Sequence, residues 1–125
     1  MRENELSKII IGESINIHRE FGPGLLESVY ESCLAYKLSK LNIEFKRQHK
    51  IPLIYESVKV KCGFRCDLLI EQKLILEIKA VEAVHPIHLT QLLTYLKLTN
   101  LRLGLLINFN VILLKDGIQR VVNNL

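Results

Sequence analysis

Three charged side chains interrupt an otherwise apolar stretch of the sequence, residues 67–80 (DLLIEQKLILEIKA). They are Asp67, Glu77 and Lys79, two carboxylates and an ammonium among leucines and isoleucines. Burying an unpaired charge is costly, so these groups need partners. Two carboxylates and a lysine at one site could hold a hard cation such as Mg²⁺ and assist the hydrolysis of a phosphate ester.

A strand, a short turn and a second strand would bring these residues together. If the chain reverses in a three-residue loop centred on Gln72, residues whose numbers add up to 144 face each other, and Asp67 lies opposite Glu77. Opposed residues share a sheet face, with Cβ atoms about 4.5–5.5 Å apart, and Lys79 points the same way. A two-residue turn would break this register. The opposite face then carries only apolar side chains: Leu68, Ile70, Leu74, Leu76, Ile78 and Ala80.

Spacing alone leaves two interpretations of the three charges open. Two carboxylates this close repel each other, which raises one pKa unless a cation intervenes, and Mg²⁺ would be such a cation. Lys79 could then orient an attacking water or offset charge on the phosphate in the transition state. Alternatively, Asp67 or Glu77 forms a purely structural salt bridge with Lys79 at the edge of the sheet.

Helices are predicted on both sides of this stretch. Apolar residues at helical spacing predict helices over 4–21 and 25–41, separated by the breaker Gly22-Pro23-Gly24. A third helix is predicted from Pro86 to Asn100.

Strands account for the remaining periodic segments. The segments predicted as strands are 43–55, 58–71, 74–82, 102–109 and 111–122. The first two join at Glu56-Ser57, the last turns at Asp116-Gly117, and Pro52 favours an edge position or a bulge. The order α-α-β-β-β-α-β-β predicts a single α/β domain, residues 1–125, with a mixed sheet flanked by helices.

The net charge of +4 is concentrated in residues 42–65, which contain six cationic residues and only two acids, Glu44 and Glu56. The cations are Lys46, Arg47, Lys50, Lys59, Lys61 and Arg65. A localised positive excess suits a polyanionic partner, although the exposed face of an ordinary strand also carries lysines. If Gly63 inserts no bulge, the last three cations share a sheet face with Asp67 and form a positive approach to it.

The composition restricts the class of protein. With 49% hydrophobic and 24% charged residues, the chain is neither disordered nor of membrane type, since no apolar run approaches the roughly 20 residues of a membrane span. The charged N-terminus does not resemble a signal peptide, so we expect a cytoplasmic protein without membrane contact. Three cysteines lack the four-ligand pattern of a zinc site and are expected to be reduced thiols: Cys33, Cys62 and Cys66.

Several motifs together resemble the PD-(D/E)xK nuclease superfamily. An Asp on one strand followed by Glu-x-Lys on the next matches Asp67 and Glu77-Ile78-Lys79, with Cys66 at the position of the motif's Pro. QLLTY, residues 91–95, resembles the Q-x-x-x-Y element of RecB-like members. GLLESVY, residues 24–30, resembles the signature of the GxxExxY protein family within that superfamily. The similarity runs along most of the chain.

The resemblance implies a restriction-endonuclease-like core and a metal-dependent nuclease site. It implies that Asp67 and Glu77 bind Mg²⁺ or Mn²⁺, with the Ile78 carbonyl as a third ligand, and that Lys79 is the catalytic lysine. The implied activity is phosphodiester hydrolysis of nucleic acid, with DNA favoured. The alternative is a non-cleaving nucleic-acid-binding or regulatory module that keeps the fold. A chain this short offers little surface for a long duplex, so a homodimer is a further expectation.

The resemblance also assigns roles outside the central hairpin. Glu27 would complete the acidic cluster as a further catalytic and metal-binding residue, although an acid in a first helical turn also stabilises the helix dipole. Gln91 would join the catalytic residues from a helix face shared with His88 and Tyr95. Tyr30, Tyr95 and His88 would support the site, although both tyrosines also suit the core with their hydroxyls hydrogen-bonded.

Overall fold

Five strands form the central sheet in the computed structural model, which describes every residue except Cys62. Their spatial order is β1-β4-β5-β6-β7, and only the β5–β6 pair is parallel. A parallel pair needs a crossover, and helix α3 provides it. The strand bounds are Phe45–Lys50 (β1), Arg65–Ile70 (β4), Leu74–Lys79 (β5), Leu103–Asn108 (β6) and Ile118–Val122 (β7).

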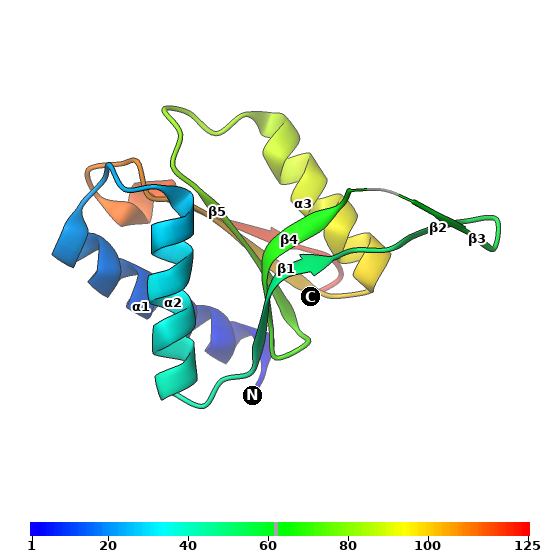
Figure 1. The fold of residues 1–125 in the computed structure, drawn as a ribbon, viewed down its shortest axis with the longest axis horizontal. Coiled ribbons are helices and arrows are strands. Elements are labelled where there is room, and N and C mark those ends of the chain that lie inside the picture. Colours follow the sequence, from blue (N-terminus) through cyan, green and yellow to red (C-terminus); the bar gives the residue numbers. More distant parts are fainter. Residues whose placement is uncertain (62) are drawn as a thin grey trace.

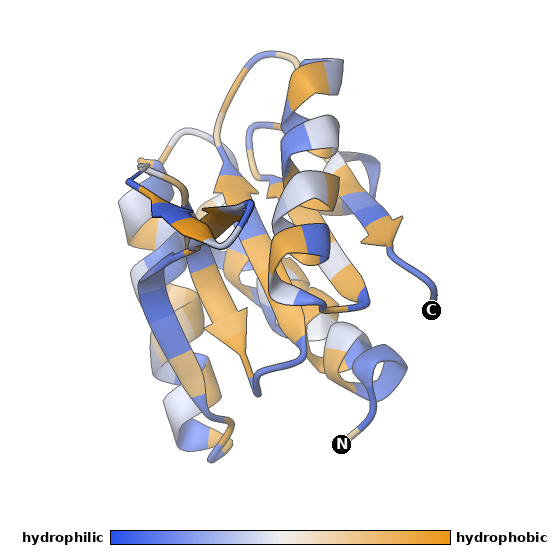
Figure 2. Ribbon diagram, turned by 90° about the vertical axis from the view of Figure 1, so that its right-hand side faces the viewer, coloured by the Kyte–Doolittle hydropathy of each residue, from blue (hydrophilic) through white to orange (hydrophobic). Residues whose placement is uncertain are grey.

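Helices cover both faces of this sheet (Figure 1). Helices α1 (Glu3–Phe21) and α2 (Glu27–Lys40) lie on one face, and α3 (Pro86–Thr99) lies on the other. Figure 2 shows apolar residues along the central strands, as expected for strands covered on both sides. The α/β class, with a mixed sheet flanked by helices, is confirmed and agrees with a restriction-endonuclease-like fold. No helix among the described residues is long and apolar enough to span a membrane.

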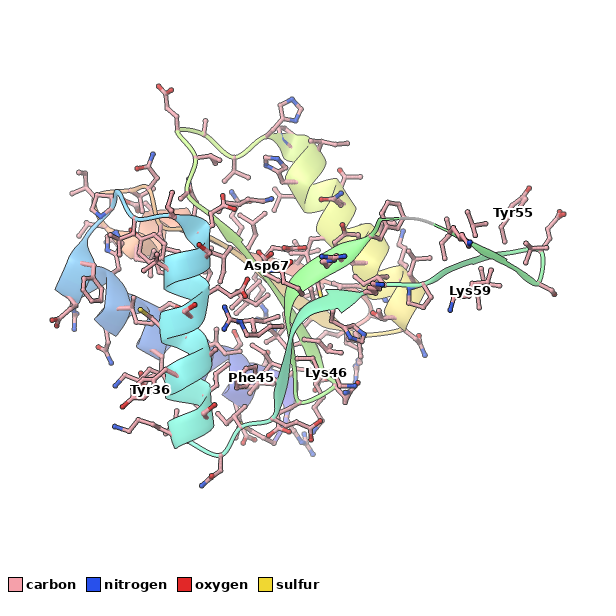
Figure 3. The ribbon with its side chains drawn as sticks, in the orientation of Figure 1. Tyr36, Phe45, Lys46, Tyr55, Lys59 and Asp67 are labelled. Carbon is pink, nitrogen blue, oxygen red and sulfur yellow. The ribbon has the colours of Figure 1, made fainter. Side chains whose placement is uncertain are left out.

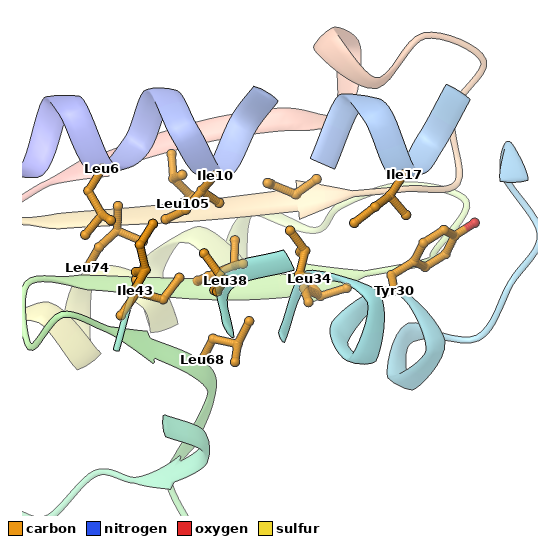
Figure 4. Packing of buried hydrophobic residues seen from close by; sticks show 14 of the residues in the cluster. Leu6, Ile10, Ile17, Tyr30, Leu34, Leu38, Ile43, Leu68, Leu74 and Leu105 are labelled. Atoms are coloured by element: carbon orange, nitrogen blue, oxygen red, sulfur yellow. The ribbon is translucent and has the colours of Figure 1, made fainter. Parts of the chain in front are cut away.

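The larger core lies between the α1–α2 pair and the sheet (Figure 4). Side chains one or two turns apart on α1, including Leu6 and Ile10, pack towards Leu34 and Leu38 of α2 and onto alternate residues of the strands. The second core lies under α3 and takes the intervening strand residues, such as Ile75. Successive side chains of β5 therefore point alternately into the larger core and into the second core.

The β4–β5 hairpin has the predicted register. Leu68 pairs with Leu76, Leu69 with Ile75 and Ile70 with Leu74, so all three pairs add up to 144. The loop Glu71–Lys73 reverses the chain, with left-handed φ values of 53° and 54° at its first two residues. The apolar face predicted from this register is the one that enters the larger core, with Ala80 packed at its margin.

The two strands predicted over 43–55 and 58–71 are each interrupted, which corrects that prediction. Strand β2 (Leu53–Tyr55) and β3 (Val58–Val60) form a separate two-stranded sheet that extends away from the body (Figure 1). The Ile51 N–H still donates to the Phe64 carbonyl at 2.9 Å, but Pro52 has no N–H with which to continue the ladder. The turn lies at Glu56-Ser57 as predicted, with φ values of 49° and 67°.

The strand predicted over 111–122 is also shorter in the structure and begins at Ile118. Residues Leu114–Gly117 form a 3₁₀ turn, η1, and Leu114 inserts into the larger core. A Cβ at Gly117 would lie 2.1 Å from the carbonyl oxygen of Asn108, so only glycine lets η1 close over the end of β6. Cys33 and Cys66 are free thiols, and the expectation for Cys62 lies outside the described residues.

Candidate active site

Asp67 and Glu77 occupy the position where β4 and β5 separate, one residue beyond the Leu68–Leu76 pair. The Ile78 backbone N–H donates to Asp67 Oδ2 at 2.7 Å, so a side-chain carboxylate takes the place of a strand carbonyl. The Asp67 carboxyl lies near enough to the Glu77 carboxyl to raise the pKa of Glu77. The structure thus brings these two acids together at the end of the hairpin.

Glu77 is the more buried of the two acids, with 8% of its surface exposed. Burial, followed by the neighbouring Asp67 carboxylate, raises the pKa of Glu77 from 4.5 to about 9, while Lys79 acts in the opposite direction. At neutral pH Glu77 therefore keeps its proton in the metal-free protein. A cation that displaced this proton would restore both carboxylates.

Lys79 ends β5 beside this pair and is half-buried. Among the described residues, ion pairs within 4.0 Å form only between Lys37 and Glu13 and between Arg47 and Glu31. The structural salt bridge considered for Lys79 is therefore not formed. Its ammonium lowers the pKa of both Glu77 and His88, which places it within electrostatic range of β5 and of the start of α3.

Glu27 reaches the same end of β5 from the first turn of α2. Its Oε2 accepts a hydrogen bond from the backbone N–H of Ala80 at 2.9 Å. Glu27 and Asp67 both line a cleft of about 610 Å³ between α2 and the sheet. The other residues lining this cleft are Leu25, Leu26, Ser28, Glu31, Gln48 and Ala80.

Tyr30 holds the loop that leads into α2, and it is fully buried. Its hydroxyl donates to the Gly22 carbonyl at 2.7 Å and accepts from the Leu25 N–H at 3.2 Å, while its ring stacks on Phe109 at 4.1 Å. Gly24 lies in that loop with a φ of 108°, which a residue with a Cβ rarely adopts. The GLLESVY segment is thus a clip that fixes the start of α2, and with it Glu27, against β5.

Glu31 and Gln48 also belong to this site, although the sequence prediction did not include them. Gln48 Nε2 donates to Glu31 Oε1 at 2.7 Å and to Asp67 Oδ1 at 3.2 Å. Gln48 has a left-handed φ of 48° within strand β1, a conformation that costs energy outside glycine. Glu31 follows Glu27 by one helical turn, and this i, i+4 spacing is the one sequence signal that could have revealed it.

Arg47, one of the six cations assigned to nucleic acid, is engaged within this network. Its Nε donates to Glu31 Oε2 at 2.8 Å and its Nη2 donates to Ser32 Oγ at 3.0 Å. The pair holds the Glu31 carboxylate in place, so that Glu31 can accept from Gln48 with its other oxygen.

The other five cations are exposed but do not form one strip. Lys46 and Lys50 lie on β1, and Arg65 starts β4. Lys59 lies out on the β2–β3 hairpin, well away from Asp67 (Figure 3), and Lys61 follows that hairpin. The expectation that Lys59 and Lys61 continue the strand face of Asp67 is wrong, because β3 and β4 belong to different sheets, whereas Arg65 lies on β4 itself, two residues before Asp67.

On α3, Tyr95 lies against the site from the opposite face of the sheet. It is 4% exposed, its hydroxyl hydrogen-bonds with the backbone of Arg65, and its ring lies 5.7 Å from that of Phe64. Burial, and after it the charge of Glu77, raises the pKa of Tyr95. Gln91, one turn earlier, is exposed on the helix surface.

His88 lies in the first turn of α3 and helps to begin that helix. Its Nδ1 accepts from the backbone N–H of His85 at 3.3 Å, and His85 Nδ1 accepts from the Ile87 N–H at 3.0 Å. Partial burial, followed by the charge of Lys79, lowers the pKa of His88, while Glu27 acts in the opposite direction. His88 therefore lies within electrostatic range of Lys79 and Glu27.

The Asp67–Glu77 pair suits a hard divalent cation. Its donors are the oxygens of two neighbouring carboxyl groups, and Mg²⁺ is commonly bound by one or two carboxylates while it keeps several waters. Among the described residues, no group of three His, Cys, Asp or Glu side chains converges on one point. Glu27, which lines the cleft together with Asp67, is hydrogen-bonded to the Ala80 N–H.

The chain matches one known protein family. The family described as the PD-(D/E)XK nuclease superfamily matches over residues 4–121, which include both acids, Lys79 and the α2 clip. A search of curated proteins and a search of solved structures gave no match. Nucleases of this superfamily generally use divalent metals such as Mg²⁺ or Mn²⁺. With a match over nearly its whole length, the chain belongs to the PD-(D/E)XK nuclease superfamily.

Proposed function

We propose that this protein is a Mg²⁺- or Mn²⁺-dependent nuclease that hydrolyses phosphodiester bonds in DNA. The observation that carries the proposal is the Asp67–Glu77 carboxyl pair beside Lys79. The Lys79 ammonium makes no ion pair within the described residues. Asp67 of this pair lines an open cleft of about 610 Å³, which leaves access for a phosphodiester. Superfamily membership supports the same chemistry.

In this proposal Asp67, Glu77 and the Ile78 carbonyl hold the cation. When bound, the cation acts as a Lewis acid on the phosphate and lowers the pKa of a coordinated water. The Ile78 N–H holds one Asp67 oxygen, which fixes the orientation of the carboxylate. Lys79 lies where its ammonium can orient the attacking water and offset negative charge on the phosphate.

Glu27, Gln91, Tyr95 and His88 have secondary roles in the proposal. Glu27 bounds the cleft opposite Asp67 and would add a negative oxygen to the cation's surroundings. Gln91 is exposed one turn after His88, where it would contact substrate rather than the buried acids. Tyr95 positions the start of β4 through Arg65. We further assign the chain to the GxxExxY family with a RecB-like Q-x-x-x-Y element, on the motifs themselves.

Nucleic acid is the proposed partner, held by exposed cations along β1 and β4: Lys46, Lys50 and Arg65. Contacts led by the phosphate backbone make binding salt-sensitive and weakly selective for sequence. Pairing of two copies would extend this surface, and a homodimer and a cytoplasmic location are both part of the proposal. A non-cleaving module that binds nucleic acid is the second candidate, because the exposed cations on β1 and β4 would serve binding without cleavage.

Cleavage assays distinguish these two candidates. The protein is incubated with branched, single-stranded and duplex DNA in Mg²⁺, in Mn²⁺ and in a chelator. A nuclease should cut only with metal, and both Glu77→Ala and Lys79→Ala should abolish cutting. The matched control is Glu44→Gln, an exposed acid just before β1, which should cut as the wild type does. Tight binding without cutting in either metal would favour the non-cleaving module.

A further inference from the structure

The β2–β3 hairpin presents an apolar face that no other part of the described chain covers. Leu53 pairs with Val60 and Tyr55 with Val58, and paired residues share a face of the ribbon. Tyr55 is 67% exposed and Val58 is 63% exposed, and the hairpin extends from the body into solvent (Figures 1 and 3). A lone two-stranded hairpin is marginally stable in water, so this shape favours a bound partner.

Cationic side chains lie on the opposite face and at the base of the hairpin. Lys59 pairs with Ile54 on the second face of the ribbon, and Lys61 follows directly. Lys50 and Arg65 flank the base where the hairpin leaves β1 and β4. Glu56, at the turn, is the only acid between residues 50 and 65. The charge of this arm is complementary to a polyanion.

A second copy of the chain is a poor occupant for the same face. Three residues per strand at about 3.3 Å, on two strands about 4.8 Å apart, give a face of roughly 100–200 Å². A stable protein interface buries about 800 Å² on each partner.

We propose that the β2–β3 hairpin is an arm that enters the major groove of duplex DNA alongside the catalytic cleft. This inference rests on the proposed function and names double-stranded DNA as the substrate class. A major groove about 12 Å wide admits a two-stranded ribbon, whereas the major groove of duplex RNA is too narrow. Tyr55 and Val58 meet base edges such as thymine methyl groups, and Lys59 and Lys61 meet phosphates.

The length of the arm sets where it contacts the duplex. From Arg65 to the turn at Ser57 the chain spans eight residues, or up to about 26 Å at 3.3 Å per residue. At about 3.4 Å per base pair, this reach corresponds to roughly seven base pairs from the start of β4. Duplexes shorter than that reach leave the arm without a groove to enter.

Three variants test the arm, and each keeps the acids and Lys79. In the first, residues 53–60 are replaced by an Asn-Gly turn, which suits a two-residue connection between paired strands. The second, Tyr55→Ser with Val58→Ser, removes only exposed apolar surface, and the third is Lys59→Gln. Ile112→Ser is the matched control, an apolar residue that is 86% exposed on a loop outside the hairpin.

Dissociation constants are measured by fluorescence anisotropy without metal, and cutting is measured with Mg²⁺. The probes are duplex DNA of about 24 base pairs, a DNA stem-loop of about six base pairs, single-stranded DNA and duplex RNA. We expect the hairpin replacement to weaken long-duplex binding about 10-fold and to leave stem-loop binding unchanged, with the double Ser variant in between. Lys59→Gln should reduce the salt slope of log K by about 1.

Other results would overturn the inference. Equal duplex binding by all variants, with cutting intact, would reject the arm while the proposed function stands. If the hairpin variants lost as much affinity for single-stranded DNA or duplex RNA as for duplex DNA, binding in the major groove of duplex DNA would be rejected. A dimer that becomes a monomer on hairpin replacement, measured by light scattering, would make a second copy the occupant. A wild-type protein that neither binds nor cuts any of the probes would reject both proposals.

Discussion

Replacing Glu77 by Gln should stabilise the metal-free protein at alkaline pH. The pKa of Glu77 is about 9 in the folded chain, against 4.5 for the free side chain. Between these values the unfolded chain has released a proton that the folded chain retains, so the free energy of unfolding falls as pH rises. The contribution is fully present below pH 4.5, declines through the window and is fully lost above about pH 9.

The size of the effect follows from the width of this window. Each pH unit between the two pKa values costs about 1.4 kcal/mol of stability, so the wild type loses about 4 kcal/mol through Glu77 between about pH 5 and pH 8. Glutamine has nearly the same shape, carries no charge and can donate a hydrogen bond to Asp67. The Glu77→Gln variant therefore keeps the packing without the cost of ionisation.

Urea unfolding in a chelating buffer measures this directly. The free energies of unfolding of wild type and Glu77→Gln should lie close together near pH 5 and diverge by about 4 kcal/mol near pH 8. Glu44→Gln, at an exposed acid, should follow the wild type throughout. Added Mg²⁺ should raise the melting temperature of the wild type more at pH 8 than at pH 6, because the cation binds the deprotonated carboxyl.

The shape of these curves decides whether Glu77 titrates between about pH 5 and pH 9 and whether it binds the cation. A difference between wild type and Glu77→Gln that stayed flat from about pH 5 to pH 9 would mean that the carboxyl does not titrate in this window. A Mg²⁺ effect that persisted undiminished in Glu77→Gln would mean that the cation binds elsewhere.

Three further predictions concern the residues that position the site. Gln48→Gly should relieve the left-handed strain and leave urea stability nearly unchanged, but it should weaken Mg²⁺ binding about 10-fold by calorimetry, because Asp67 loses a partner. Unchanged Mg²⁺ affinity would rule out this positioning role. Tyr30→Phe should keep the ring packing and lose both hydrogen bonds to the preceding loop, at a cost of about 1–2 kcal/mol in urea unfolding; a neutral result would show that the clip does not need the hydroxyl. Gly117→Ala should destabilise the fold by at least about 2 kcal/mol, because its Cβ would lie 2.1 Å from a backbone oxygen. Gly12→Ala is the control within α1, where nothing lies within 4 Å, and it should raise the melting temperature by a few degrees.

The central hairpin could be predicted because local turn chemistry and the apolar pattern agree. Apolar residues at every second position set which face of β4 and β5 is buried, and the three-residue loop Glu71–Lys73 keeps that register from the Leu68–Leu76 pair to the Ile70–Leu74 pair. The ends of β1 and β4 could not be predicted in the same way. The effect of Pro52 depends on which strand lies beside it, and that neighbour follows from the three-dimensional pairing.

The network around Glu31 escaped prediction for a different reason. Its central element is a left-handed φ at Gln48, and nothing in the residue type indicates such a conformation within a strand. An arginine in a basic segment also suggests a contact with nucleic acid, whereas Arg47 in fact donates to Glu31. Both features depend on the side of the sheet to which α2 docks, which pairs residues 16 and 17 positions apart.

The two acids are held by different parts of the fold, and this separates positioning from metal binding. Asp67 is fixed by the Ile78 N–H and by Gln48, so its orientation is set before any cation binds. Glu77 is fixed by burial against Asp67 and keeps a proton until a cation replaces it. Loss of Gln48 should therefore weaken cation binding at every pH, whereas the ionisation of Glu77 makes that binding increase with pH. A Gln48 variant whose Mg²⁺ affinity changed its pH dependence, rather than its overall strength, would show that the two acids are positioned as one unit.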